Sequence, residues 1–441
     1  MEKVVILGAG ESGSGAAILA RKLGFDVFLT DSGLIKDIFK KDLENEGILY
    51  EESGHEMERV LSANLVIKSP GIPGNTPAVL AIIEKGIPVI SEIEFAARYS
   101  KVKTIGITGS NGKTTTTMLT FHLMKQAGFK VEVGGNVGFS FARLVAAELD
   151  GNVSEWYVLE LSSFQLDDIY TYRPDISMIL NITPDHLDRY EYRMEKYIAA
   201  KFRITQSQLP SDFFIFNADN DNIRQYLNDH QVGSVSRLPV SLDQYNGGKL
   251  HFPQYETTFD LANANLRGAH NWFNAYCASM ASLLAGAEPK AVQEGLNTFQ
   301  NVEHRLEFVA EVGGVEYIND SKATNVDSVY FALGAVTKPI VLILGGVDKG
   351  NDYRQIEGLV KEKVKAIVCM GKDNGPILSF FEHSGIPIIQ TLSAEEAVAA
   401  ASKLSVPGDV VVLSPACASF DLFANYEDRG RRFKQAVIDL G

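Results

Sequence analysis

The sequence predicts an α/β protein in which short buried strands alternate with helices in three successive domains. Three observations carry this prediction. Short apolar runs rich in Val and Ile recur along the chain, as buried parallel strands do. Glycine-rich turns follow two of these runs, at residues 8–13 and 109–115. The length of 441 residues fits three domains of about 150 residues each, which we place at residues 1–100, 101–298 and 299–441.

The first domain is predicted to be a doubly wound, Rossmann-like unit. Its expected parallel strands are Val4–Leu7, Val27–Leu29, Leu65–Ile67 and Pro88–Ile90. The turn Gly8-Ala9-Gly10-Glu11-Ser12-Gly13 follows the first strand and matches the GxGxxG pattern, and Asp31 ends the second strand. Taken alone, these two features predict a dinucleotide site for NAD.

The second domain is predicted to be a P-loop ATPase domain of α/β type. The heptad Gly109-Ser110-Asn111-Gly112-Lys113-Thr114-Thr115 follows an apolar run and opens a helix. Backbone N–H groups of such a loop can bind phosphates, while Lys113 reaches the outer phosphates and Thr114 can ligate Mg²⁺. The first glycine of a common P-loop would stand at position 107, which is Ile107 here. We nevertheless predict ATP binding.

Acidic and imidazole groups follow two further predicted strands of this domain, Trp156–Leu161 and Ile176–Ile182. Glu160 stands at the end of the first strand, where a carboxylate can hold Mg²⁺. His186 follows the second strand in Asp185-His186. Lys201 lies in a helical stretch, and from the sequence alone a surface lysine is the favoured interpretation.

The third domain is predicted to be a second Rossmann-like unit that resembles a nucleotide-binding fold. It follows the predicted helix Pro289–Phe299, and its expected strands are Val315–Ile318, Ile340–Leu344, Ala366–Met370 and Val410–Leu413. The loop Asp320-Ser321-Lys322-Ala323-Thr324-Asn325 after the first strand combines an acid, a cation and two hydroxyls. Such loops bind ligands in α/β domains. Asn246-Gly247-Gly248 predicts a simple turn.

Composition indicates small-molecule partners. A net charge of −14 argues against nucleic acid or an anionic membrane as the main partner. The three cysteines, Cys277, Cys369 and Cys417, are far apart, which indicates neither a disulfide framework nor a zinc site and fits a reducing cytoplasm. The chain enters its first strand at once and contains no apolar stretch of about 18 residues. We expect a cytoplasmic monomer without membrane insertion.

Six motifs together resemble the Mur ligases of bacterial cell-wall synthesis. They are Gly109–Thr115, Gly134–Gly138, Leu159–Gln165, Asp185-His186, His304-Arg305 and Asn319–Asn325. The C-terminal segments Leu413–Asp421 and Glu427–Gly430 are similar to those of the D-glutamate-adding type. The resemblance covers nearly the whole chain. It implies a UDP-binding first domain, a central ATPase domain and a C-terminal amino-acid-binding domain that closes over the site, with hinges near residues 101 and 300.

The resemblance also implies site residues. For the UDP-sugar substrate, and no longer for a dinucleotide, they are Glu11, Ser12, Asp31, Ser32, Ser69, Gly71 and Asn136. For ATP they are Gly109, Ser110, Asn111, Gly112, Lys113, Thr114, Thr115, Asn271, Asn274, Arg305 and Asp320. For D-glutamate they are Lys322, Thr324, Lys349, Ser419, Phe420 and Tyr426. Thr114 and Glu160 would hold one Mg²⁺, and His186 and a carbamylated Lys201 a second.

The reaction implied is ATP-dependent addition of D-glutamate to UDP-N-acetylmuramoyl-L-alanine through an acyl phosphate, in peptidoglycan synthesis. Lys113, His186 and Lys201 are the expected catalytic residues. Either His186 or a base from bulk solvent could deprotonate the amine. The alternatives are a sister Mur ligase, a folylpolyglutamate synthase, an NAD-dependent dehydrogenase resting on GxGxxG and Asp31, and a non-catalytic nucleotide-binding protein.

Overall fold

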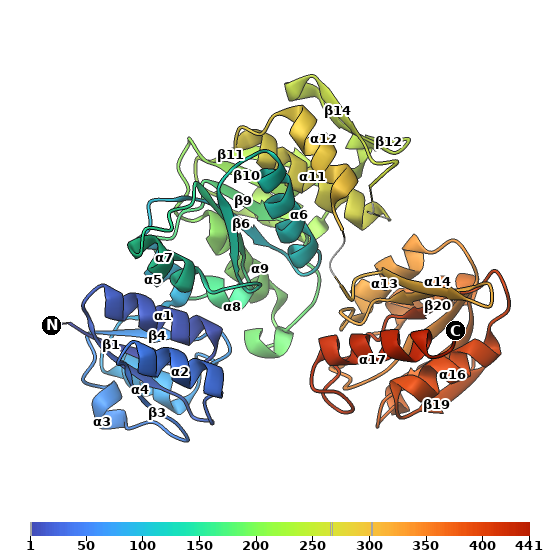
Figure 1. The fold of residues 1–441 in the computed structure, drawn as a ribbon, viewed down its shortest axis with the longest axis horizontal. Helices are drawn as coiled ribbons and strands as arrows, with labels where there is room; N and C mark the ends of the chain where they lie inside the picture. The colour runs from blue at the N-terminus through green and yellow to red at the C-terminus, as the bar shows by residue number, and fades with distance from the viewer. Residues whose placement is uncertain (1, 265, 267, 301–302) are drawn as a thin grey trace. The chain divides into compact units, whose positions relative to one another are not determined.

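The computed structural model describes residues 2–264, 266, 268–300 and 303–441. Its contacts divide the chain into two compact units. The first comprises the chain up to Ala264 together with Trp272–Phe299, and the second comprises the segment ending at Asn271 together with Gln300–Gly441. Figure 1 shows the elements of both units. Three of the four sheets are mainly or wholly parallel, as predicted, while the domain boundaries at 100/101 and 298/299 stay a prediction.

The first sheet is parallel, with strand order β3-β2-β1-β4-β5. Its strands are β1 (Lys3–Leu7), β2 (Asp26–Thr30), β3 (Leu49–Glu51), β4 (Leu65–Lys68) and β5 (Val89–Ser91). Four of them lie close to the predicted bounds; β3 is additional. One face packs against α1 (Glu11–Lys22), α2 (Asp37–Asn45) and α5 (Glu92–Ala97). The other packs against α3 (Met57–Val60) and α4 (Pro77–Glu84).

The central sheet is also parallel, with order β11-β10-β9-β6-β8-β7. Its strands are β6 (Lys103–Thr108), β7 (Val131–Gly135), β8 (Trp156–Glu160), β9 (Ile176–Ile179), β10 (Phe213–Asn217) and β11 (Ser236–Val240). Its helices are α6 (Lys113–Gln126), α7 (Phe141–Leu149), α8 (Ser163–Leu166), α9 (Met194–Phe202), α10 (Asp221–Asp229), α11 (Ala269–Leu284) and α12 (Pro289–Thr298).

The predicted strand Ile176–Ile182 is too long, because β9 ends at Ile179. The next residues leave the strand and bond to the glycine-rich loop, where Ser110 N donates to Asn181 O at 2.9 Å. The apolar character of Leu180 and Ile182, both fully buried, therefore reflects burial beside that loop and not strand pairing.

A small antiparallel sheet lies between α10 and α11 in the sequence. It contains β12 (Tyr245–Asn246), β13 (Lys249–Phe252) and β14 (Thr257–Asp260). The predicted turn is confirmed, since Gly247 and Gly248 join β12 to β13 with φ values of 56° and 84°. Positive φ at both central positions is the geometry that favours glycine in a two-residue hairpin.

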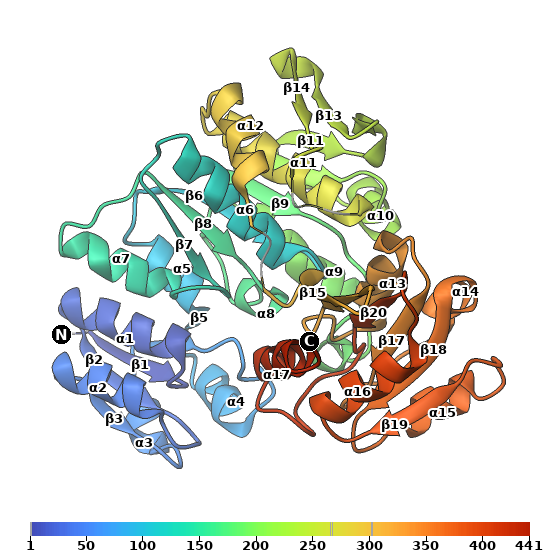
Figure 2. The ribbon, with the colours of Figure 1, turned by 45° about the vertical axis from the view of Figure 1, so that its right-hand side comes forward.

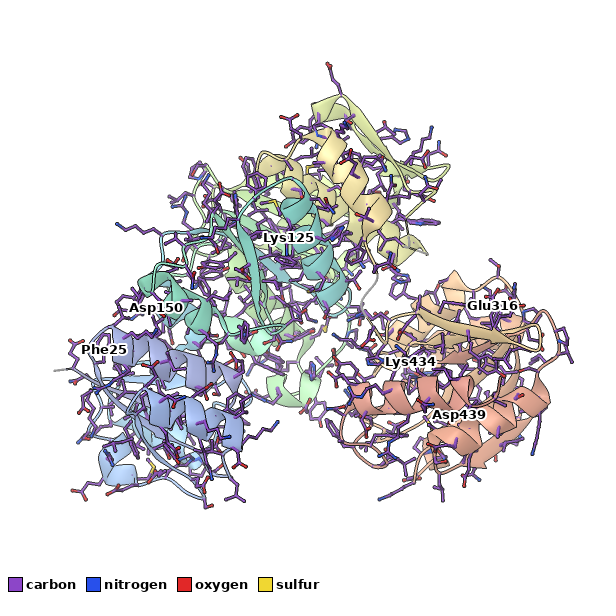
Figure 3. The ribbon with its side chains drawn as sticks, in the orientation of Figure 1. Phe25, Lys125, Asp150, Glu316, Lys434 and Asp439 are labelled. Atoms are coloured by element: carbon purple, nitrogen blue, oxygen red, sulfur yellow. The ribbon has the colours of Figure 1, made fainter. Side chains whose placement is uncertain are left out.

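Helices α1 and α7 lie side by side in both views (Figures 1 and 2) and join the first two sheets into one unit. Glu11 of α1 accepts hydrogen bonds at the start of α7 from Ser140 N at 3.0 Å and Arg143 Nε at 2.9 Å. Lys22 pairs with Asp150, which is labelled in Figure 3. A carboxylate at a helix N-terminus is favourable because the orphan N–H groups and the helix dipole are positive there.

The third sheet forms the second unit, with order β15-β16-β20-β17-β18-β19. Its strands are β15 (Glu307–Val312), β16 (Val315–Asn319), β17 (Ile340–Leu344), β18 (Val364–Met370), β19 (Ile388–Thr391) and β20 (Val410–Leu413). Within this sheet β15 pairs antiparallel with β16, and the other described pairs are parallel. One face packs against α13 (Val326–Ala335), α14 (Arg354–Lys363) and α15 (Gly375–Phe381), the other against α16 (Ala394–Leu404) and α17 (Tyr426–Ile438).

None of the helices in the described part of the chain combines the length and the apolar character needed to cross a membrane.

Candidate active site

The GxGxxG turn after β1 is tight on one side and open on the other. Gly8 has a φ of +90°, and a Cβ there would lie 2.7 Å from Ser69 Oγ. A Cβ at Gly13 would lie 1.8 Å from Gly8 O. At Gly10 a Cβ would meet no heavy atom within 4 Å. Gly8 and Gly13 therefore serve packing, whereas Gly10 leaves its side of the turn open to a ligand.

The residues predicted for the UDP-sugar follow adjacent parallel strands of the first sheet. Asp31 is already engaged: its two carboxylate oxygens accept hydrogen bonds from Ala9 N at 2.7 Å and Gly33 N at 2.8 Å. Glu11 is engaged with α7, so both acids also hold the protein's own backbone. Of the remaining predicted residues, Ser12 lies in the first turn of α1, Ser32 follows β2, and Ser69 and Gly71 follow β4. Asn136 follows β7 of the central sheet.

The predicted phosphate loop lies between β6 and α6. Gly112 adopts a φ of 82° as the N-cap of α6. Lys113 Nζ donates to Gly109 O and Ser110 O, each at 2.8 Å, so its side chain folds back over the loop. A Cβ at Gly112 would lie 2.6 Å from Asn274 Oδ1, so this residue of α11 lies beside the loop.

Residues after β9 hold the other side of this loop, and the sequence interpretation missed them. Asn111 N donates to Asn181 Oδ1 at 2.8 Å. Ser110 Oγ donates to Thr183 O at 2.8 Å and lies 3.0 Å from the Tyr197 hydroxyl. The signal was available, because β9 was predicted in this domain and residues after neighbouring parallel strands meet at one edge.

Glu160 is a buried carboxylate with one oxygen left for a ligand. It ends β8, which pairs with both β6 and β7. Its Oε1 accepts a hydrogen bond from Asn136 Nδ2 at 2.9 Å, whereas Oε2 has no hydrogen-bond partner within residues 2–264, 266, 268–300 and 303–441. Thr114 at the start of α6 is also buried. Oxygen donors of this kind fit Mg²⁺.

Lys201 is buried at the phosphate loop, so the surface-lysine interpretation is wrong. Lys201 is 1% exposed. Its Nζ donates to Gly109 O at 2.8 Å and lies 4.6 Å from the centre of the Tyr197 ring. Burial, and next the charge of Lys113, hold the pKa of this amine well below its usual range, against the opposing effect of Asp185 and other acids.

His186 stands on the exposed side of the same group of residues. It has a left-handed backbone with a φ of 53°, and its ring contacts the edge of Phe164 at 5.2 Å between centroids. His186 Nε2 lies 3.6 Å from Asp185 Oδ2. Across the described residues, no three His, Cys, Asp or Glu side chains gather to form a metal site by themselves.

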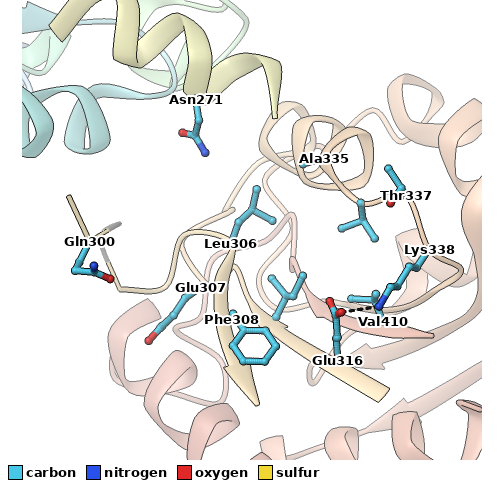
Figure 4. Close-up of a pocket in the computed structure, with 12 residues that line it drawn as sticks. Asn271, Gln300, Leu306, Glu307, Phe308, Glu316, Ala335, Thr337, Lys338 and Val410 are labelled. Carbon is cyan, nitrogen blue, oxygen red and sulfur yellow. Dashed lines mark hydrogen bonds and ion pairs between the residues drawn. The ribbon is translucent and has the colours of Figure 1, made fainter. Parts of the chain in front are cut away.

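In the second unit, Arg305 precedes β15 and Asp320 follows β16, and the two charges interact. Asp320 accepts hydrogen bonds from Ser414 Oγ at 2.9 Å and Leu306 N at 3.2 Å. Burial raises the pKa of Asp320 to about 7, while Ser414 and then the Arg305 charge oppose the rise. A hollow of about 560 Å³ lies nearby, where Figure 4 shows Leu306 and the ion pair of Glu316 with Lys338 at 2.6 Å.

Five of the residues predicted for D-glutamate lie on loops that follow strands of the third sheet, and the sixth, Tyr426, is the first residue of α17. Val347 N donates to Ala418 O at 2.8 Å, which pairs the loop of Lys349 with that of Ser419. Lys322 Nζ lies 5.3 Å from the ring centre of Tyr426. Thr324 shares the loop of Lys322, and Phe420 is 73% exposed. The predicted ATP residues are divided between the units, with Asn271, Arg305 and Asp320 in the second.

Three family models match this chain in succession. The "Mur ligase MurD-like, N-terminal domain" matches residues 2–91, the "Mur ligase middle domain" residues 107–282, and the "Mur ligase, glutamate ligase domain" residues 304–417.

Curated relatives match over the full length. The chain is 50% identical over 448 residues to a protein of Christiangramia forsetii named "UDP-N-acetylmuramoylalanine--D-glutamate ligase", covering 100% of both chains. It is 48% identical over 449 residues to a Bacteroides fragilis protein of the same name, again covering 100% of both.

Solved structures share the fold at low identity. UDP-N-acetylmuramate-alanine ligase MurC of Thermotoga maritima has a TM-score of 0.62 at 18% identity, covering 100% of both chains. MurF ligase of Thermotoga maritima in complex with ADP has a TM-score of 0.62 at 14% identity, covering 94% of this chain and 96% of that one. Folylpolyglutamate synthase of Mycobacterium tuberculosis reaches 0.56 at 16% identity, covering 72% and 89%. With family models along its length and full-length relatives at up to 50% identity, the chain belongs to the Mur ligase family.

Proposed function

We propose that the chain ligates D-glutamate to UDP-N-acetylmuramoyl-L-alanine with ATP, giving ADP and phosphate, in the cytoplasmic synthesis of peptidoglycan precursors. The observation that carries the proposal is the 45–50% identity to ligases of this name over 99–100% of the chain. The site geometry supports it, because the phosphate loop, Glu160 and Lys201 occupy one buried region of the first unit.

The first step activates an unreactive carboxylate. The alanyl carboxylate of the UDP-sugar attacks the γ-phosphorus of ATP, its O–P bond forms as the bond to ADP breaks, and an acyl phosphate results. Lys113 neutralises charge on the transferred phosphoryl group; the position of its ammonium on the loop carbonyls Gly109 O and Ser110 O supports this role. Gly109–Thr115 and Asn274 hold ATP from the first unit, and Asn271, Arg305 and Asp320 hold it from the second.

Two metal sites are part of the proposal. Thr114 and Glu160 would hold one Mg²⁺, and His186 and Lys201 a second. Bound Mg²⁺ supplies charge neutralisation at the phosphates. The free Glu160 Oε2 and the buried Thr114 fit the first ion.

We further propose that Lys201 carries a carbamate. An ammonium group cannot ligate a cation, whereas the neutral amine forms a C–N bond to CO₂ and releases one proton to solvent, which converts the side chain into an anionic oxygen ligand. Lys201 supports this assignment by its position, because Nζ is buried at hydrogen-bond distance from the phosphate loop.

The second step forms the amide bond. The amine of D-glutamate, once deprotonated, attacks the acyl carbon, and the tetrahedral intermediate expels phosphate. His186 or a solvent base takes the proton. Lys322, Thr324, Lys349, Ser419, Phe420 and Tyr426 bind the amino acid, while Glu11, Ser12, Asp31, Ser32, Ser69, Gly71 and Asn136 bind the UDP-sugar.

One assay tests the function. Phosphate release is measured with ATP, Mg²⁺ and UDP-N-acetylmuramoyl-L-alanine against a panel of amino acids in both configurations, and we expect stimulation by D-glutamate alone. Stimulation by L-alanine with UDP-N-acetylmuramate, by a diamino acid, or by glutamate with a folate would assign a related ligase instead. A fluorescence change of NADH on mixing would favour the dehydrogenase.

A further inference from the structure

Arg429 is a buried arginine near the start of α17 that contacts three loops of the second unit. It is 1% exposed. Its guanidinium donates to Ser321 Oγ at 2.9 Å and Ser321 O at 2.8 Å, to Cys417 O at 3.2 Å, and to Gly345 O at 3.4 Å. These partners follow β16, β20 and β17, which are neighbours in the sheet. One side chain thus ties together the loops at the carboxyl ends of three adjacent strands.

Each of these loops carries a residue proposed to bind the amino-acid substrate, namely Lys322, Lys349 and Ser419. The helix itself contributes a fourth, since Tyr426 is the first residue of α17 and its carbonyl accepts a hydrogen bond from Ser321 Oγ at 2.8 Å. The acceptor residues therefore depend on Arg429 for their relative positions, although Arg429 is too deeply buried to touch a substrate in the loops.

The charge of Arg429 is not paired with a carboxylate. All its hydrogen-bond partners are neutral oxygens, and in the part of the chain that the structure describes no carboxylate lies within ion-pair distance of it. Burial lowers its pKa to about 10, so the group stays protonated at neutral pH. The carboxylates of Asp421 and Asp320 attract this cation without a hydrogen bond to it, so they offset part of the positive potential that it adds at the loops.

We propose that Arg429 is a positioning residue that sets the affinity for the acceptor amino acid. It fixes the loops of Ser321, Gly345 and Cys417 so that Lys322, Lys349 and Ser419 converge on the substrate carboxylates. The inference rests on the proposed function, because it assumes that D-glutamate binds at these loops.

The test compares Arg429→Gln and Arg429→Lys with wild type in the phosphate-release assay. For each protein, kcat and the KM for ATP, the UDP-sugar and D-glutamate are measured. We expect KM for D-glutamate to rise about tenfold or more in Arg429→Gln, since several charge-assisted hydrogen bonds are lost. Arg429→Lys keeps the charge and restores part of the affinity. KM for the UDP-sugar stays unchanged. Arg432→Gln is the matched control, because Arg432 lies on the same helix but is exposed, where it pairs with Asp428 and lies over the Phe423 ring.

Ser321→Ala provides a second variant in case a buried arginine cannot be replaced without unfolding. It removes the hydroxyl that links Arg429 to Tyr426, and we expect a smaller rise in the same KM in a protein that still folds, with a modest fall in thermal unfolding temperature because the Arg429 Nε–H loses its acceptor. An unaltered KM for D-glutamate in Ser321→Ala, or equal changes in the KM of all substrates in folded Arg429 variants, would overturn the inference. A wild-type protein that does not respond to D-glutamate would instead refute the proposed function.

Discussion

At the scale of single residues, the active site depends on polar groups that are buried but only partly satisfied. Glu160 uses one oxygen for Asn136 and keeps the other available, and Lys201 is buried beside a second lysine. A buried charge is costly unless it is paired. Such an arrangement is unfavourable for folding by itself and becomes favourable when cations and phosphates bind, which supports a role in binding them.

Replacement of Lys113 by Ala tests the phosphate loop. Phosphate release should fall roughly 100- to 1000-fold, the usual loss when one group that stabilises transition-state charge is removed. Thermal unfolding should change little, because the loss of the two hydrogen bonds to Gly109 O and Ser110 O is offset by removal of a positive charge from the N-terminus of α6, where it opposes the dipole. Lys125→Ala, an exposed lysine at the other end of α6 (Figure 3), is the control and should retain full activity. Near-normal turnover of Lys113→Ala would refute the role of this loop in ATP binding.

Replacement of Lys201 by Ala tests the carbamate. Acyl-phosphate formation should slow sharply, and the residual rate should not respond to bicarbonate. Wild-type activity should fall when CO₂ and bicarbonate are removed and recover when bicarbonate is restored. Lys196→Ala is the matched control, because Lys196 lies on the same helix and pairs with Glu191 at the surface. Full wild-type activity without bicarbonate would refute the carbamate.

The sequence predicted which loops form the site but not how deeply each side chain is buried. Gly109–Thr115 and Asp320–Asn325 could be placed because glycine spacing and strand-end positions have a direct structural meaning. Lys201 could not, since a lysine in a helix has no local signal that distinguishes a buried position from an exposed one. Its burial depends on a tertiary contact with Gly109, which lies 92 residues away in the sequence.

At the scale of elements, two carboxylates from helices of the first sheet accept hydrogen bonds from residues at the start of α7. Glu11 bonds to Ser140 and Arg143, and Glu92 of α5 accepts a hydrogen bond from Ala142 N. Glu92 is fully enclosed, and burial raises its pKa to about 8, with the charge of Glu11 acting in the same direction. The helix N-terminus only partly offsets the cost of burying this acid.

This predicts that Glu92 makes stability depend on pH. Its folded pKa of about 8 lies above the ordinary value of 4.5, so the native state binds the proton more tightly. The stabilising contribution is complete below about pH 4.5 and is lost as pH rises through about 8. Glu92→Gln keeps an acceptor for Ala142 N without a charge. It should unfold at a higher temperature than wild type at pH 9, with the advantage shrinking toward pH 5.

The control for this experiment is Glu84→Gln, an exposed glutamate at the end of α4, which should leave the pH dependence unaltered. Parallel stability curves for wild type and Glu92→Gln between pH 5 and 9 would contradict the assignment.

The elements that were predicted well are those whose pattern is set by local chemistry. The β-branched runs of the first and third sheets gave strands near their true bounds, including Ile340–Leu344 and Val410–Leu413 without change. Strand β9 was predicted too long because the apolar residues after it are buried by the phosphate loop. The small sheet of residues 245–260 was missed except for its turn, since two- to four-residue strands have too little periodicity to detect.

At the scale of the whole molecule, the proposed function assigns residues of both units to one reaction. The first unit holds the phosphate loop and Glu160, while the second holds Arg305, Asp320 and the acceptor loops. Four of the six motifs follow or end strands of the central sheet, and the other two lie beside β15 and β16 of the third sheet. An acyl phosphate would react with water if the site stayed open, so we expect the C-terminal unit to close when the substrates are bound.

Closure can be measured by energy transfer between dyes attached to Lys125→Cys in the first unit and Asp439→Cys in the second. Both positions are exposed (Figure 3), and the native Cys277, Cys369 and Cys417 are buried and should label slowly. Transfer efficiency should change on adding ATP, Mg²⁺ and the UDP-sugar together. The same double-cysteine protein with Lys113→Ala should respond far less, because ATP is then held without its phosphate contact. An efficiency that is unaffected by the full set of substrates, in a labelled protein that still turns over, would show that the units need not move and that water is excluded by the loops themselves.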